Sequence, residues 1–185
     1  RLREFRVYTG HAPTFLGALA LGAEGGILAA ANLAPRAYRA LLEKGVAREM
    51  ARLGAETVVE RSAADESTAA AAANRFDAGV CLSLRTGAEE GCRCSYFESG
   101  RFRSEAGFHM ASRVLEELTN SEWTAGSLAG RTYALLRETR MPALVLEPLA
   151  TGDVEAMRHL VSQAGVVSRA VARGVQRGVE EPIEE

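Results

Sequence analysis

Residues 135–147 read Leu-Leu-Arg-Glu-Thr-Arg-Met-Pro-Ala-Leu-Val-Leu-Glu, and this stretch decides the fold class. Pro142 ends a short helical pattern, and the four apolar residues that follow it lead to the carboxylate of Glu147. A strand that lacks an alternating polar face is typical of a sheet covered on both sides. The stretch therefore predicts a buried strand with Glu147 at its carboxyl end.

Strand and helix patterns alternate outward from this stretch along nearly the whole chain. The expected strands cover residues 4–8, 25–29, 56–60, 80–84, 92–97 and 142–147. The expected helices cover residues 15–21, 35–53, 62–76, 105–118, 130–138 and 154–179. This alternation favours an α/β domain with a mostly parallel sheet and helices on both faces, that is, three layers.

Composition narrows the function classes. Hydrophobic residues make up 47% of the 185 residues and charged residues 25%, as in a globular domain. The net charge of −2 and the isoelectric point near 6.0 give no basic footprint for nucleic acid. No apolar run is long enough and sufficiently free of charge to span a membrane.

Several motifs occur in a fixed order between residues 45 and 180. They are Glu-Thr-Val-Val-Glu-Arg at 56–61, Ala-Asn-Arg-Phe-Asp-Ala at 73–78, Cys-Leu-Ser-Leu-Arg-Thr-Gly at 81–87, Gly-Cys-Arg-Cys-Ser-Tyr-Phe at 91–97, and the stretch at 135–147. Together they resemble the zinc-dependent N-acetylmuramoyl-L-alanine amidases that cleave peptidoglycan. The resemblance implies an amidase-like domain over residues 46–180, followed by an acidic tail at 181–185.

The same resemblance places two residues at the chemistry of the site. In the family, zinc is held by His, Glu and His, and a glutamate that ends the last strand is the general base; Glu147 matches that base by position. Arg85 stands where the second zinc histidine is expected. Because a guanidinium stays protonated in proteins, it has no lone pair to offer a metal. We expect Arg85 to pair with Glu147 instead, if both line one pocket.

The first 45 residues resemble a different family. Val-Tyr-Thr-Gly-His at 7–11, Leu-Gly-Ala-Glu-Gly-Gly-Ile at 21–27 and Ala-Asn-Leu-Ala-Pro-Arg at 31–36 are similar to a late barrel segment of the dihydrodipicolinate synthase and N-acetylneuraminate lyase aldolases. These aldolases need a Schiff-base lysine on a barrel strand. Lys44, the only lysine, lies on an expected helix, so aldolase activity is excluded. The segment (residues 1–45) would stand in for the first amidase elements.

Two residues of this segment have alternative interpretations. His11 follows an expected strand, and Glu24 lies thirteen residues later, which is close to the spacing of the first two zinc ligands in the amidases. They are either a retained metal ligand pair, or a turn residue and a loop residue that belong to the aldolase-like pattern. The flanking residues fit the aldolase-like pattern better.

The chain is also similar to the CwlM-type amidase homologues of actinobacteria, on Ser-Leu-Arg at 83–85, Gly-Arg-Thr at 130–132 and Thr-Arg-Met-Pro at 139–142. That branch implies a degraded zinc site, no cofactor and a regulatory role in the cytoplasm. The leading hypothesis is thus a domain that binds peptidoglycan, muropeptides or a cell-wall biosynthesis protein. The alternatives are an active, extracytoplasmic zinc amidase, and a chimera that cannot complete its sheet.

The remaining candidates have plainer interpretations. Cys81, Cys92 and Cys94 lack a fourth metal ligand nearby and are expected to be buried structural thiols. His109 is expected at the edge of the core and His159 on a helix surface. A loop tryptophan at position 123 could stack on a glycan, although local packing explains it more simply.

Overall fold

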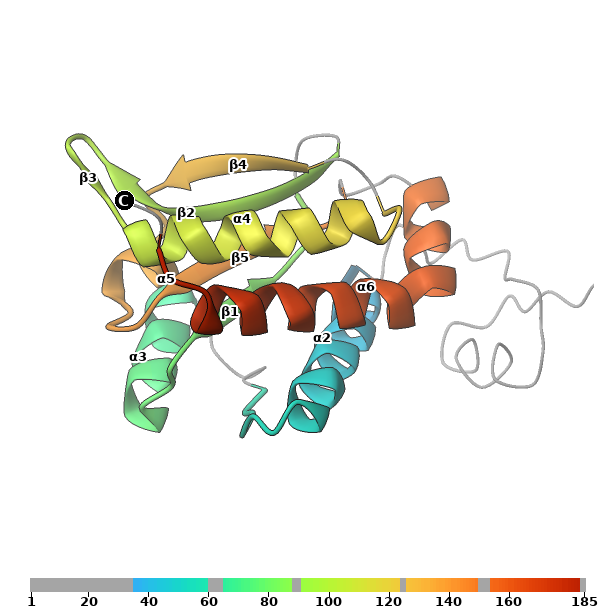
Figure 1. The fold of residues 1–185 in the computed structure, drawn as a ribbon, viewed down its shortest axis with the longest axis horizontal. Coiled ribbons are helices and arrows are strands. Elements are labelled where there is room, and N and C mark those ends of the chain that lie inside the picture. Colours follow the sequence, from blue (N-terminus) through green and yellow to red (C-terminus); the bar gives the residue numbers. More distant parts are fainter. Residues whose placement is uncertain (1–34, 60–64, 88–90, 124–125, 150–153, 184–185) are drawn as a thin grey trace, which may run out of the picture.

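The computed structural model describes residues 35–59, 65–87, 91–123, 126–149 and 154–183 (Figure 1). The expected elements at residues 4–8, 15–21 and 25–29 lie outside these ranges, as do His11 and Glu24. Among the described residues, no helix is both long and apolar enough to cross a bilayer.

The described strands form one mixed sheet. The central strand β5 (Ala143–Glu147) pairs in parallel with β1 (Cys81–Leu84) on one side and antiparallel with β2 (Cys92–Ser99) on the other. Beyond β2 lies β4 (Gly126–Arg131), which runs parallel to it. The short strand β3 (Phe102–Arg103) folds back on the end of β2 as a hairpin.

Helices cover both faces of this sheet, which confirms the expected α/β class (Figure 1). One face packs against α2 (Pro35–Arg52), α4 (Glu105–Asn120) and α6 (Val154–Glu180), and the other against α3 (Glu66–Phe76) and α5 (Ala134–Glu138). All five residues of β5 are buried, as its unbroken apolar run predicts.

The period-two alternation of β5 divides its side chains between the two cores. Leu144 and Leu146 belong to the larger core beneath α2, α4 and α6, whereas Ala143 and Val145 belong to the smaller core beneath α3 and α5. By the same alternation, Glu147 faces the α3 and α5 side. This places its carboxylate at the carboxyl end of the central strand, on the side of the two shorter helices α3 and α5.

The helix α3 is fixed at both ends by side-chain bonds. Its N-cap, Asp65, accepts a hydrogen bond from the backbone N–H of Thr68 at 2.7 Å. Near the other end, the Asn74 amide donates to the carbonyl of Glu138 and accepts from the N–H of Arg140, each at 2.9 Å. Because Glu138 ends α5 and Arg140 leads into β5, Asn74 ties α3 to the connection that precedes the central strand.

The long helices α4 and α6 approach each other through small residues. Ala170 is buried, and Gly174 and Gly178 follow it at four-residue spacing on α6. A Cβ added at Gly174 would lie 2.5 Å from the Cα of Val114, and one at Gly178 would lie 3.0 Å from the Cα of Met110. The backbones therefore meet at a distance that only glycine permits at these positions.

Two expected elements were wrong. The described residues 56–59 form no strand, and Val58 and Val59 are exposed. The helix expected over residues 130–138 is instead the end of β4 followed by the shorter α5. Pairing with β2 determines the conformation of β4, whose glycines and alanine give no strand signal of their own.

We expect Gly174→Ala to lower the free energy of unfolding by about 1–3 kcal/mol, since the new methyl group meets the backbone of α4. Gly165→Ala is the matched control on the same helix, because its nearest neighbour is the flexible end of Arg169 at 3.6 Å. That variant should be neutral or up to about 1 kcal/mol more stable. Chemical denaturation measures both, and equal effects would contradict the close helix contact.

Candidate functional site

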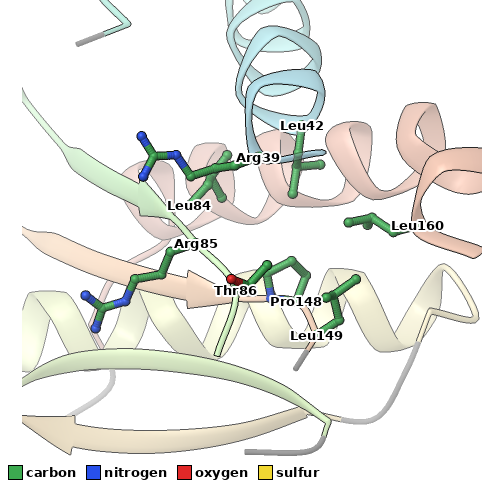
Figure 2. Close-up of a pocket in the computed structure, with 8 residues that line it drawn as sticks. All are labelled: Arg39, Leu42, Leu84, Arg85, Thr86, Pro148, Leu149 and Leu160. Atoms are coloured by element: carbon green, nitrogen blue, oxygen red, sulfur yellow. The ribbon is translucent and has the colours of Figure 1, made fainter. Parts of the chain in front are cut away.

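The candidate site lies at the carboxyl ends of β1 and β5, on the face covered by α3 and α5. Arg85 directly follows β1, and Glu147 is the last residue of β5. Since parallel strands bring their carboxyl ends to one edge, the pairing of β1 with β5 sets these two side chains together. Figure 2 shows Arg85 extending away from Leu42 and Leu160, which lie on the opposite face.

The guanidinium of Arg85 bridges two carboxylates. Its Nε donates to Oε1 of Glu147 at 3.2 Å, and its Nη1 donates to Oε1 of Glu66 at 2.7 Å. The guanidinium carbon also lies 4.2 Å from the centre of the Tyr133 ring, a cation–π contact. The pairing expected between Arg85 and Glu147 is thus present, and Glu66 and Tyr133 complete an arginine cluster around it.

Glu147 is only 7% exposed, which excludes the simpler possibility of a carboxylate facing solvent. Its Oε2 makes no hydrogen bond, and Nη1 of Arg93 lies 3.8 Å from that oxygen. Gly87 lies against the side chain, since a Cβ there would be 3.3 Å from the Cβ of Glu147. The carboxylate is therefore enclosed by two arginines and a close turn of backbone.

Electrostatics keeps the cluster charged. Burial opposes the charge of Arg85, but the hydrogen bond to Glu66 and the negative charge of Glu147 outweigh it, so the pKa of Arg85 lies above its ordinary value. At any pH of ordinary use, the guanidinium is a permanent cation between the two carboxylates.

The described residues around Glu147 do not fit a zinc ion. A catalytic zinc site needs three nitrogen, sulfur or oxygen ligands around one point, with a fourth position left for water. Here a guanidinium contacts the carboxylate, and it would repel a metal cation. In the described part of the chain, no three His, Cys, Asp or Glu side chains converge in a metal-binding group. His11 and Glu24, the sequence-based ligand candidates, lie outside that part, so their role stays a prediction.

The other sequence candidates make no contact within the cluster that the structure records. Cys92 and Cys94 are buried in the larger core, whereas Cys81 packs against the smaller one on the opposite face of the sheet. His109 is buried on α4. Trp123 stacks on the His159 ring with centroids 5.1 Å apart, so both rings are used in packing.

Comparison with solved structures identifies the fold. CwlV, an N-acetylmuramoyl-L-alanine amidase from Bacillus (Paenibacillus) polymyxa var. colistinus, is 18% identical, with a TM-score of 0.66 over 80% of this chain and 86% of its catalytic domain. The N-acetylmuramoyl-L-alanine amidase of Clostridium difficile 630 is 20% identical, with a TM-score of 0.61 over 76% of this chain and 83% of its own.

A third structure is the CwlD amidase of Clostridioides difficile in complex with the GerS lipoprotein. It is 11% identical, with a TM-score of 0.62 over 77% of this chain and 85% of its own. The chain has the fold of N-acetylmuramoyl-L-alanine amidases. No protein-family model and no curated protein matches its sequence, so the amidase fold rests on structure alone.

Sequence reasoning missed three members of the cluster: Glu66, Tyr133 and Arg93. Glu66 is the first residue of α3, where a negative charge is favourable for the helix dipole. Its second oxygen lies 3.5 Å from the N–H of Leu135 at the start of α5, so it contacts two helix N-termini. Arg93 lies opposite Glu147 in the pairing of β2 with β5, a register that the sequence does not reveal.

We expect Arg85→Ala to lower the free energy of unfolding by about 2–4 kcal/mol, because it leaves the buried charge of Glu147 without its hydrogen-bonded partner. Adding Glu147→Gln to that variant should restore part of the loss, since the uncompensated charge is removed. Arg52→Ala is the control, as it breaks only an exposed pair with Glu49 and should change stability by about 0.5 kcal/mol or less. Urea denaturation measures the free energy of unfolding of all three variants. If Arg85→Ala lowers it no more than Arg52→Ala does, Arg85 does not stabilise the cluster.

Burial should make the three thiols unreactive. It raises the pKa of Cys81 to about 11 and that of Cys92 to about 12, and that of Cys94 lies well above its ordinary value for the same main reason. At pH 8, we expect alkylation at least about a hundredfold slower than for a free thiol, whose pKa is about 8.5. Intact-mass measurement over time should show three modifications only after unfolding. A thiol that is modified rapidly in the native protein would contradict this expectation.

Proposed function

We propose that this chain is a member of the N-acetylmuramoyl-L-alanine amidase family that binds muropeptides without hydrolysing them. The observation that carries the proposal is the guanidinium of Arg85, which bridges Glu147 and Glu66 at the carboxyl edge of the sheet. The fold, shared with solved amidases, supports the family assignment.

The chemistry of the cluster favours binding over hydrolysis. A zinc amidase needs a metal to acidify water and a free carboxylate to take the proton of that water. In this chain Glu147 already accepts a hydrogen bond from Arg85, and Arg93 is close to its other oxygen. A general base must contact the water whose proton it takes, and here both carboxylate oxygens already face an arginine. The cluster is therefore a static polar surface suited to ligand contacts.

A cell-wall protein is the second candidate ligand. The CwlD amidase, to which this chain is structurally similar, was solved in complex with a lipoprotein. That precedent supports a role in which an amidase-fold domain engages a protein of the cell wall or of its biosynthesis. Binding to a protein would not require the carboxylate to be free.

Zinc content tests the proposal first. After equilibration with excess zinc and desalting, elemental analysis should find far less than one zinc per chain. One tightly held zinc per chain would overturn the proposal and restore the active amidase. In Arg85→His, an imidazole replaces the guanidinium. A gain of one zinc in that variant alone would show that His11 and Glu24 converge with it, so that the arginine is what excludes the metal.

Ligand binding separates the remaining alternatives. A soluble muropeptide that contains the N-acetylmuramoyl-L-alanine amide should bind in calorimetry and be recovered uncleaved by mass spectrometry. Arg101→Ala, on the exposed turn between β2 and β3, is the matched control and should leave binding unchanged. Cleavage of the amide would support the active amidase. Absence of binding in a cooperatively folded sample would leave the protein partner as the remaining candidate.

A further inference from the structure

A groove of about 950 Å³ runs along the edge of β1 that faces away from β5. It lies between α2 and α6 on one side and α3 on the other, and residues 54–59 also line it. Of the eight large hydrophobic residues exposed in the described part of the chain, five line this groove: Leu53, Val58, Val59, Phe76 and Val179. Apolar side chains gathered around one groove indicate that another apolar segment covers them.

The backbone of β1 indicates what kind of segment fits. The N–H of Cys81 donates to the carbonyl of Pro142 at 2.9 Å, and that of Arg85 donates to Leu146 at 3.0 Å. In a parallel ladder, alternate residues face the same neighbour, so the N–H and carbonyl groups of Leu82 and Leu84 point towards the groove. Within the described ranges, β1 pairs with β5 alone. Backbone groups within a sheet are normally paired, and an extended strand in the groove would satisfy those of both residues.

The position of α2 indicates where that strand comes from. The helix begins at Pro35, and its first turns reach the carboxyl end of β1, where Arg39 and Leu42 lie beside Leu84 (Figure 2). A strand parallel to β1 would end at this same edge, and a short loop would then lead into α2. Residues 25–29, which lie outside the described ranges, read Gly-Gly-Ile-Leu-Ala and leave five residues before Pro35. That spacing is typical of a loop between a strand and a helix.

We propose that residues 25–29 dock into the groove as an additional strand, parallel to β1. The proposal goes beyond the ligand-binding role, since it concerns how an aldolase-like segment completes an amidase-like sheet. The proposed strand also bears on one of the two metal ligand candidates, Glu24. A strand in this direction brings Ala29 to the edge that carries Arg85, and it leaves Glu24 at the opposite end, about 16 Å away at about 3.3 Å per residue. Glu24 would then be too far from Glu147 to share a metal with it.

The chain offers a direct test, because Ile27 and Ile183 are its only isoleucines. With isotope-labelled isoleucine methyl groups, the full-length protein gives just two methyl signals. We expect nuclear Overhauser contacts from Ile27 to side chains of the groove, such as Leu82, Met50 or Phe76. Ile183 is half exposed near the end of the described chain and is the internal control, without contacts to β1. An Ile27 methyl group without groove contacts would overturn the proposal.

Hydrogen exchange provides the second measurement. We expect the Leu82 and Leu84 amides to be protected in the native protein and Ile27→Asp to raise their exchange rates at least tenfold. Val7→Asp is the matched control, since it puts the same charge into the other expected N-terminal strand, residues 4–8. If Val7→Asp exposes these amides and Ile27→Asp does not, residues 4–8 occupy the groove and bring His11 to the site. If the protection of these amides decreases when the protein is diluted, a second copy of the chain occupies the groove. Either of these two results would refute the proposal.

Discussion

The charge of Glu147, buried at the end of the central strand, is the constraint on which the site depends. An ionised carboxylate in this position is tolerated only when cations and hydrogen bonds compensate for lost water. Arg85 supplies that compensation from the neighbouring strand, and Arg93 adds a second positive charge from the strand on the other side. Glu66 then engages the remaining side of Arg85, which links the beginning of α3 to the sheet. One buried charge thus fixes the relative positions of three strands and a helix.

This arrangement shows how an amidase fold can hold two carboxylates together with an arginine. A metal and a guanidinium both supply positive charge to surrounding carboxylates, but the guanidinium is covalently attached and needs no loading. It is also planar and directional, so it orients its partners through hydrogen bonds instead of polarising a substrate. At this end of the sheet, the side chain of Arg85 balances the charge of the two carboxylates.

The sequence predicts the elements whose signals are local. The run that became β5 is apolar throughout because both of its faces are covered, and α4 shows its pattern because one face meets the sheet. β4 could not be predicted, since its Gly-Ser-Leu-Ala-Gly composition becomes a strand only through pairing with β2. At the site, Arg85 and Glu147 could be predicted because the motifs that resemble the amidases contain both residues. Tyr133 and Glu66 come from helix ends that only the tertiary fold brings near.

The order in which the strands are made has a further consequence for the living cell. β1 pairs with β5 in the described sheet, and the two residues of their ion pair are separated by 62 positions. At about 5–20 residues per second, a ribosome needs roughly 3–12 seconds to synthesise that interval. During this time an apolar strand has been made and its permanent neighbour has not. Over that interval the side of β1 that pairs with β5 stays unpaired by it, and this part of the sheet can close only when β5 emerges.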